Sequence, residues 1–144
     1  FDDASQMFRL YNASFKRLPD PGGLAYWIDV FTPDENGVRD NDSRVVALSF
    51  IRSDEFKSRY GDDITSEELV RTMYVNVLGR DIDAATGIPY EADGIGLDES
   101  GFDYWVGSLN HVDPSKRETD YEVLLGFSES PENCGLFTDM TGIV

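Results

Sequence analysis

The sequence predicts an all-α protein of about seven helices, built as two related halves that share one core. Three observations predict this fold class. Apolar residues recur at the three- and four-residue spacing of amphipathic helices, and capping residues stand where those stretches begin. The same pattern of aromatic and capping residues also occurs twice along the chain. We place the two halves at residues 1–61 and 62–144.

The first half contains the signals for four helical segments. A helix is expected over residues 4–16, where aromatic and aliphatic residues line one face. Asp20 followed by Pro21 predicts the start of a second helix, because Asp accepts a backbone N–H at the N-cap and proline suits the first helical position. A polar loop over residues 34–42 separates it from a third helix, and Ser53 caps a short fourth segment.

The second half repeats these signals. Thr65 with a glutamate three residues later is a capping box, in which each side chain satisfies the other residue's backbone N–H. Asp98 caps the counterpart of the second helix. Asp113 followed by Pro114 predicts the start of the next helix, and Ser130 that of one last turn. The tail TDMTGIV carries no strong pattern.

The repeated positions are aromatic, capping or basic residues, which favours a structural role. Asp20 corresponds to Asp98, and both are expected to cap helices. The arginine that ends the preceding helix in each half is expected to bridge to the cap aspartate or to a glutamate, Glu55 or Glu132. The tryptophans should fill the space between helices, and the two halves should pack through their Tyr–Trp faces. The residues interpreted as structural are Arg17, Asp20, Trp27, Arg80 and Trp105.

The halves differ by one insertion. Asp20 stands three positions after Arg17, whereas Asp98 stands eighteen positions after Arg80, so the second half carries fifteen extra residues at about 81–97. An insertion there should lie on the surface, and it is dense in the carboxylates that Ca²⁺ prefers. Solvated acidic loops are the alternative interpretation. The candidate metal ligands are Asp81, Asp83, Asp93, Asp98 and Asp103, and a second acidic loop spans residues 34–42.

The charge excludes several classes of partner. With 28 acidic and 12 basic residues the net charge is −16, which repels nucleic acids and anionic lipid surfaces. No apolar run approaches the roughly 18 residues of a membrane helix, so membrane insertion is not expected.

One cysteine excludes an internal disulfide. The absence of an initial Met suggests a piece of a longer polypeptide.

Catalytic motifs are weak. His111 is the single histidine, in a predicted loop, and Cys134 has no base near it in the sequence. A sugar or peptide groove is a further possibility, because Tyr90, Tyr104 and neighbouring aromatic residues flank the insertion and could form a stacking platform.

The half-repeat resembles a bacterial family of domains of unknown function, found in secreted calcium-binding (RTX, haemolysin-type) and cyanobacterial surface proteins. Its pattern is Tyr-x-x-x-Leu-Gly-Arg, then Pro-Asp-x-x-Gly-x-x-Tyr-Trp, then Gly-Phe-x-x-Ser-x-Glu-Phe. Tyr74 to Arg80 match the first part, and Pro19 to Trp27 the second. One departure is Lys16, which stands where the pattern has glycine. The resemblance implies a helical, extracellular, non-catalytic module.

Three functions follow as hypotheses. The first is a non-catalytic module of a larger secreted or cell-surface bacterial protein, acting as a spacer or binding a protein or glycan partner, with Ca²⁺ in the insertion. The second is a carbohydrate-active or hydrolytic enzyme that uses acidic residues around the insertion, which requires a pocket with two carboxylates and an aromatic wall. The third is an assembly linker, which requires an exposed apolar patch and self-association.

Overall fold

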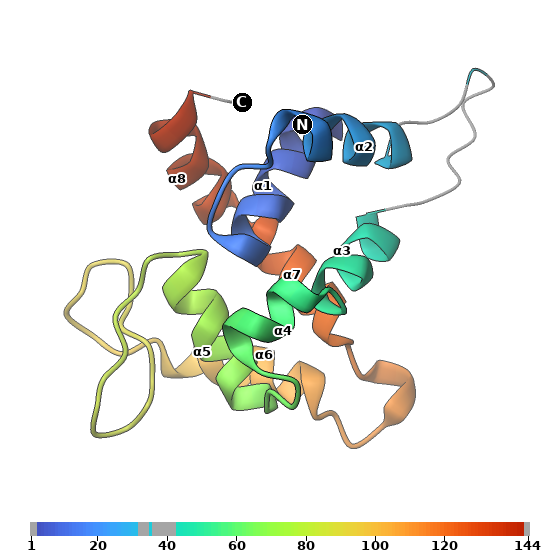
Figure 1. Ribbon diagram of the computed structural model, residues 1–144. Coiled ribbons are helices and arrows are strands. Elements are labelled where there is room, and N and C mark those ends of the chain that lie inside the picture. The colour runs from blue at the N-terminus through green and yellow to red at the C-terminus, as the bar shows by residue number, and fades with distance from the viewer. Residues whose placement is uncertain (1–2, 32–34, 36–42, 143–144) are drawn as a thin grey trace.

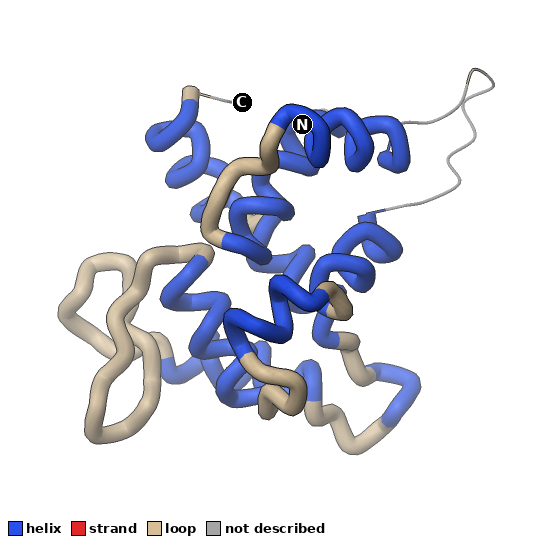
Figure 2. The backbone as a smooth tube through the Cα atoms, in the orientation of Figure 1, coloured by secondary structure: helices blue, strands red, loops and turns tan. Residues whose placement is uncertain are grey.

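The computed structural model describes residues 3–31, 35 and 43–142 of the chain. Within them every named element is a helix, so the all-α prediction is confirmed. This part of the chain holds eight α-helices and one 3-10 helix, against the expected seven or so. The elements are α1 (Asp3–Phe15), α2 (Pro21–Phe31), α3 (Ser43–Ile51), α4 (Asp54–Tyr60), α5 (Ser66–Asn76), α6 (Glu99–Leu109), η1 (Pro114–Lys116), α7 (Asp120–Ser128) and α8 (Pro131–Thr141) (Figure 1, Figure 2).

The predicted caps begin several of these helices. The Thr65 hydroxyl accepts the backbone N–H of Glu68 at 3.2 Å, and the Glu68 carboxylate accepts that of Thr65 at 3.3 Å, so the capping box is confirmed. Ser53 and Ser130 cap α4 and α8 in the same way, each accepting a backbone N–H three residues on, at 3.2 Å in both cases. Within the described residues, no helix combines the length and apolar character that a bilayer-spanning helix requires.

Two helix boundaries near the C-terminus differ from the prediction. Asp113 caps only the short η1, and α7 begins after Thr119, which forms a second capping box with Glu122. A capping box satisfies two backbone donors at once, so the later start is the more stable one. The last element is also longer than one turn, because α8 continues to Thr141 and buries one face through Asn133 and Phe137.

The repeated aromatic residues make equivalent packing contacts in the two copies. Trp27 meets Phe50 of α3 with their ring centroids 4.8 Å apart. In the second copy Trp105 meets Phe127 of α7 at the same distance. A tyrosine of the helix before each tryptophan also meets these phenylalanines, at 5.5 Å in the first copy and 5.3 Å in the second. The tryptophans therefore occupy equivalent places, as predicted.

The helices of both halves contribute to one continuous hydrophobic core. The halves meet chiefly through α3 and α7, and α1 packs on both α7 and α8. Arg9 of α1 lies inside this contact at 1% exposure, and its Nη2 donates to Glu129 Oε2 at 2.6 Å. We expected the Tyr–Trp faces to join the halves, and this is wrong. The tryptophans lie at the edge of the core while the tyrosines beside them face outward, because the interior is filled by the rings of α1, α3, α5 and α7.

The insertion lies on the surface, as the loops at the left of Figure 1 show. It contains no helix, and its two isolated antiparallel bridges pair Ile82 with Pro89 and Tyr90 with Leu97. Its first loop is tied back to α5, because Arg71 Nε donates to the Gly87 carbonyl at 2.7 Å. The insertion therefore has a defined path that ends at the N-terminus of α6.

Candidate functional site

A pocket lined by charged, aromatic and small residues lies where the insertion returns to the helices. Its volume is about 240 Å³. The end of α5, the start of α6, α7 and the start of α8 each contribute to its wall. We call it the Arg80 pocket. Its lining residues are Tyr74, Leu78, Arg80, Asp98, Gly101, Trp105, Phe127, Ser130 and Glu132.

Arg80 is the central donor of the pocket. Its Nε donates to Glu132 Oε1 at 3.1 Å, and Nη2 donates to both Glu132 oxygens at 2.8 and 2.7 Å. Its Nη1 donates to the Tyr90 carbonyl of the insertion at 2.8 Å. Burial alone lowers the pKa of Arg80, but the hydrogen bonds and charge of Glu132 outweigh it, so the pKa is raised. The guanidinium therefore fastens three segments together: the end of α5, the insertion and the start of α8.

Asp98 and Tyr74 form the second part of the network. Asp98 Oδ1 accepts the backbone N–H of Gly101 at 3.1 Å, which is the predicted N-cap of α6. The Tyr74 hydroxyl donates to Asp98 Oδ2 at 3.0 Å, and the Arg80 Nη1 lies 3.7 Å from the same oxygen. Burial, together with the Asp98 hydrogen bond and charge, raises the pKa of the Tyr74 hydroxyl.

Gly101 is required by the closeness of this network. A Cβ at that position would lie 2.6 Å from both the Tyr74 hydroxyl oxygen and Asp98 Oδ1. Contacts this short force a shift of the neighbouring groups. The glycine of the repeat motif is thus a consequence of placing a tyrosine against the helix cap.

The first copy holds the same groups without the insertion. Arg17 donates from Nε and Nη2 to Glu55 at 3.1 and 2.9 Å, and Asp20 Oδ1 accepts the Gly23 N–H at 2.7 Å. The predicted bridges of both arginines to Glu55 and Glu132 are confirmed by these distances. The first pair is more open, with Arg17 42% exposed against 11% for Arg80. The insertion therefore closes over one side of a site that is open in the first copy.

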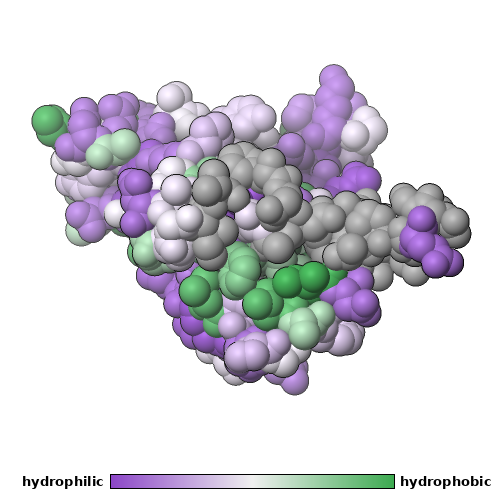
Figure 3. All heavy atoms as spheres, turned by 90° about the horizontal axis from the view of Figure 1, so that it is seen from above, coloured by the Kyte–Doolittle hydropathy of each residue, from purple (hydrophilic) through white to green (hydrophobic). Residues whose placement is uncertain are grey.

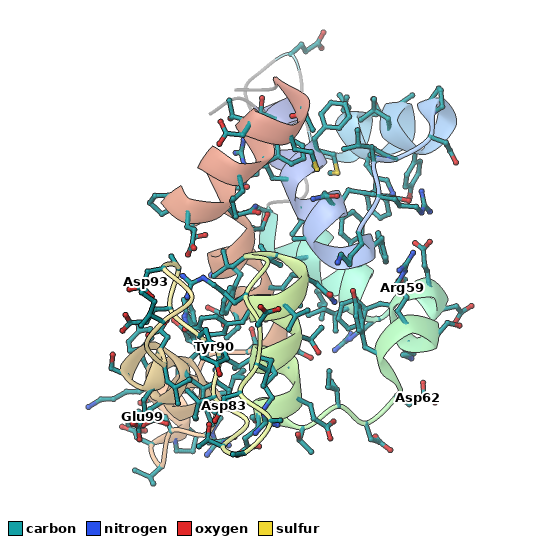
Figure 4. The ribbon with its side chains drawn as sticks, turned by 90° about the vertical axis from the view of Figure 1, so that its left-hand side faces the viewer. Arg59, Asp62, Asp83, Tyr90, Asp93 and Glu99 are labelled. Atoms are coloured by element: carbon teal, nitrogen blue, oxygen red, sulfur yellow. The ribbon has the colours of Figure 1, made fainter. Side chains whose placement is uncertain are left out.

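The five candidate metal ligands are not gathered in one place. Asp83 bonds to Thr86 within the first loop, and Asp93 accepts the N–H of Ile95 in the second. Figure 4 shows Asp83 and Asp93 at opposite ends of the insertion. Asp98 is engaged in the Arg80 pocket, while the side chains of Asp81 and Asp103 are exposed.

Among the described residues no three His, Cys, Asp or Glu side chains stand close enough together to hold a metal ion. Calcium binding by the insertion stays a prediction. The other acidic loop, residues 34–42, lies outside the described residues except for Glu35.

His111 and Cys134, the histidine and the cysteine considered as catalytic candidates, both have structural contacts. His111 Nδ1 accepts the backbone N–H of Asp113 at 3.0 Å, which shapes the turn before η1. Cys134 is buried in α8, and burial raises the pKa of its thiol. A thiol with a raised pKa holds less of the reactive thiolate form near neutral pH.

Three contacts of the described residues were not predicted from the sequence. The Arg9–Glu129 pair was hidden because Arg9 occupies a buried position of α1, a place where arginine is rare. The tie from Arg71 to Gly87 joins residues whose contact no local pattern indicates. The bond between Tyr74 and Asp98 could have been found, since both positions recur in the other half.

Comparison with known proteins places the chain in one family. The model of the family described as "Domain of unknown function (DUF4214)" matches residues 47–92 and 96–137. The chain belongs to this family. The two adjacent segments are consistent with two copies of a DUF4214 domain. Neither the curated proteins nor the solved structures give a match. The division of the DUF4214 chain into halves at residue 61 stays a prediction.

Proposed function

We propose that this DUF4214 chain is a non-catalytic helical module of a larger secreted or cell-surface bacterial protein, where it acts as a spacer or binds a partner. The observation that carries the proposal is the use of the same side chains in the same contacts in both copies. The arginines hold glutamates, the cap aspartates hold helix N-termini, and the tryptophans cover phenylalanines. A duplicated scaffold of this kind occupies the reactive groups in packing and leaves the outer surface for recognition.

Charge and composition support the same proposal. A net charge of −16 keeps a chain soluble and well separated from its own copies, which suits a module outside the cell. The buried cysteine, with its raised pKa, holds less of the thiolate form that an oxidising environment attacks.

The location is tested with antibodies against the purified chain, applied to intact and to lysed cells of the bacterium that encodes it. The proposal expects the antibodies to label intact cells, or to find the chain in the culture medium, and expects brief protease treatment of intact cells to remove the label. Signal that appears only after lysis would contradict the proposal. An antibody against a cytoplasmic enzyme of the same organism is the control for leakage.

A hydrolytic enzyme is the second candidate, and one observation favours it. The Arg80 pocket contains two carboxylates, those of Asp98 and Glu132, with Trp105 in its wall. Both carboxylates already have protein partners, which favours the structural interpretation. The variants Asp98→Asn and Glu132→Gln decide between the two, with Glu55→Gln in the first copy as the matched control. Turnover of chromogenic glycosides that is lost in the first two variants and kept in the third, with folding intact, would establish the enzyme.

A further inference from the structure

Two tyrosines of the repeat point outward instead of into the core. The side chain of Tyr26 on α2 is 61% exposed, and that of Tyr104 on α6 is 62% exposed. Each touches the tryptophan that follows it, with ring centroids 5.0 and 5.3 Å apart and interplanar angles of 79° and 77°. The two copies thus present the same aromatic pair with the same exposure.

Packing alone does not account for this recurrence. The two helices otherwise share few residues: α2 reads PGGLAYWIDVF and α6 reads ESGFDYWVGSL. The shared tryptophan and glycine have structural reasons, which are the contact with phenylalanine and the crowding at the helix cap. A large aromatic side chain that is mostly exposed gains little from burial, so its presence in both copies points to an interaction with something outside the chain.

The surroundings of each tyrosine leave the ring accessible. Long side chains of a helix lean over the turn that precedes them. That turn holds Gly22 and Gly23 before Tyr26, and Ser100 and Gly101 before Tyr104, so no bulky side chain of the same helix stands there. Exposed carboxylates lie close by in sequence: Asp29 on α2, Glu99 and Asp103 on α6.

An exposed electron-rich ring on a chain of net charge −16, with exposed carboxylates on the same helix, favours a cationic ligand. The chain's own arginines already use this chemistry. The guanidinium carbon of Arg17 lies 5.0 Å from the centre of the Tyr11 ring, and that of Arg80 lies 5.6 Å from that of Tyr74. Neutral sugars also stack on tyrosine, but the negative charge around these rings adds nothing to their binding.

We propose that Tyr26 and Tyr104 form two equivalent docking points for a basic segment of a partner protein, whose lysine or arginine side chains lie on the rings and pair with the neighbouring carboxylates. The proposal rests on the proposed function and names the partner chemistry of that module.

The test uses the full chain and a synthetic peptide in which lysine and arginine alternate with glycine and serine. A peptide of equal length with glutamine at every basic position, and a neutral glucan oligosaccharide, are the comparison ligands. Binding is measured by calorimetry and by tryptophan fluorescence, because Trp27 and Trp105 each touch one of the tyrosines. We expect the basic peptide to bind and both comparison ligands to bind far more weakly.

The variants separate the rings from general charge attraction. The double variant Tyr26→Ala/Tyr104→Ala keeps the net charge, and we expect it to bind the basic peptide roughly tenfold more weakly. Tyr26→Phe/Tyr104→Phe keeps the rings and should bind like the wild type. Met140→Ala removes a side chain of similar exposure, 63%, on α8, and should change nothing. If the alanine variant loses its fold, Tyr26→Gln/Tyr104→Gln replaces it, because it also keeps the net charge, and it should likewise bind weakly.

Equal binding of the basic peptide to the wild type and to the double alanine variant would overturn the proposal. The rings would then contribute nothing, and the net negative charge alone would account for the binding. The proposal would also be overturned, in favour of a glycan partner, if the oligosaccharide bound in a way that requires the tyrosines while the basic peptide did not bind. Either failure leaves the module itself in place, as a spacer or a glycan binder, provided that antibodies label intact cells. Failure of the antibody test contradicts the module whatever the peptide does.

Discussion

At the residue scale, the turn before each repeated arginine has a different residue in the two copies. Gly79 has φ +67°, and Lys16 stands in the same left-handed region at φ 54°. Glycine adopts this conformation freely, whereas a side chain costs about 1 kcal/mol there. The first copy therefore carries strain at a position where the family pattern has glycine.

Replacing Lys16 by glycine should relieve this strain. We expect Lys16→Gly to raise the free energy of unfolding by about 1 kcal/mol, measured by urea denaturation. Lys57→Gly, in the interior of α4, is the matched control and should lower it by about 1 kcal/mol, because glycine is a poor helix former. A Lys16→Gly variant that is no more stable than the wild type would show that the turn is unstrained.

The Tyr74 hydroxyl makes the free energy of unfolding depend on pH in the alkaline range. Its pKa is raised in the folded chain by burial and by Asp98, while in the unfolded chain it is near the ordinary value of about 10. The folded state therefore holds the proton that the unfolded state releases above that value. The stabilisation is complete below about pH 10 and declines as the pH rises toward the higher folded pKa.

We expect the free energy of unfolding to fall between about pH 9 and pH 11 in the wild type, and to fall less steeply in Tyr74→Phe, which has no hydroxyl to titrate. Urea denaturation at each pH measures both slopes. Tyr26→Phe is the control, because it removes an exposed tyrosine hydroxyl that lies outside the Arg80 pocket. Identical slopes for wild type and Tyr74→Phe would contradict the pocket as described.

At the element scale, the limits of the helices were predictable where a cap satisfies backbone donors locally. The Thr65 box was predicted. The Thr119 box is also visible in the sequence, but the prediction started this helix at Asp113 with Pro114 and did not consider Thr119. The Arg80 bridge to Glu132 followed from the repeat. What local sequence could not indicate is which faces meet. The contact of α3 with α7 and the burial of Arg9 depend on residues far apart in the chain.

The insertion is an element that the fold should survive without. The first copy joins Arg17 to Asp20 through Leu18 and Pro19 alone, with an equivalent ion pair and cap. We expect a chain in which residues 81–97 are replaced by Leu-Pro to remain helical and to unfold cooperatively. Its free energy of unfolding should fall by about 1–3 kcal/mol, since the contacts of Arg71 and Arg80 with two insertion carbonyls are lost.

Circular dichroism and urea denaturation measure both properties. Arg71→Ala in the full-length chain is the control, because it removes one of the two ties and should account for part of the loss. An unfolded or molten shortened chain would show that the insertion is part of the scaffold, and would remove the reason for regarding it as a surface addition.

At the scale of the whole molecule, the dominant feature is its charge. Figure 3 shows hydrophobic side chains gathered in one area of the face seen from above, with hydrophilic residues over much of the rest. The ion pairs of the described residues neutralise only some of the carboxylates, among them Glu55, Glu129 and Glu132. The remainder repel one another, and this repulsion is greater in the compact state than in the unfolded chain.

Salt should therefore stabilise the protein. We expect the midpoint of thermal unfolding to rise with sodium chloride concentration, because screening over roughly 10 Å at 0.1 M weakens the repulsion. Calcium and magnesium chloride at equal ionic strength then separate screening from binding. A calcium site in the insertion requires an additional rise with Ca²⁺ that EDTA reverses and that the shortened chain lacks, since an ion that binds only the folded state stabilises it by mass action. If Ca²⁺ and Mg²⁺ give the same midpoint, the predicted site does not exist, and the scattered positions of Asp83, Asp93 and Asp98 are the reason.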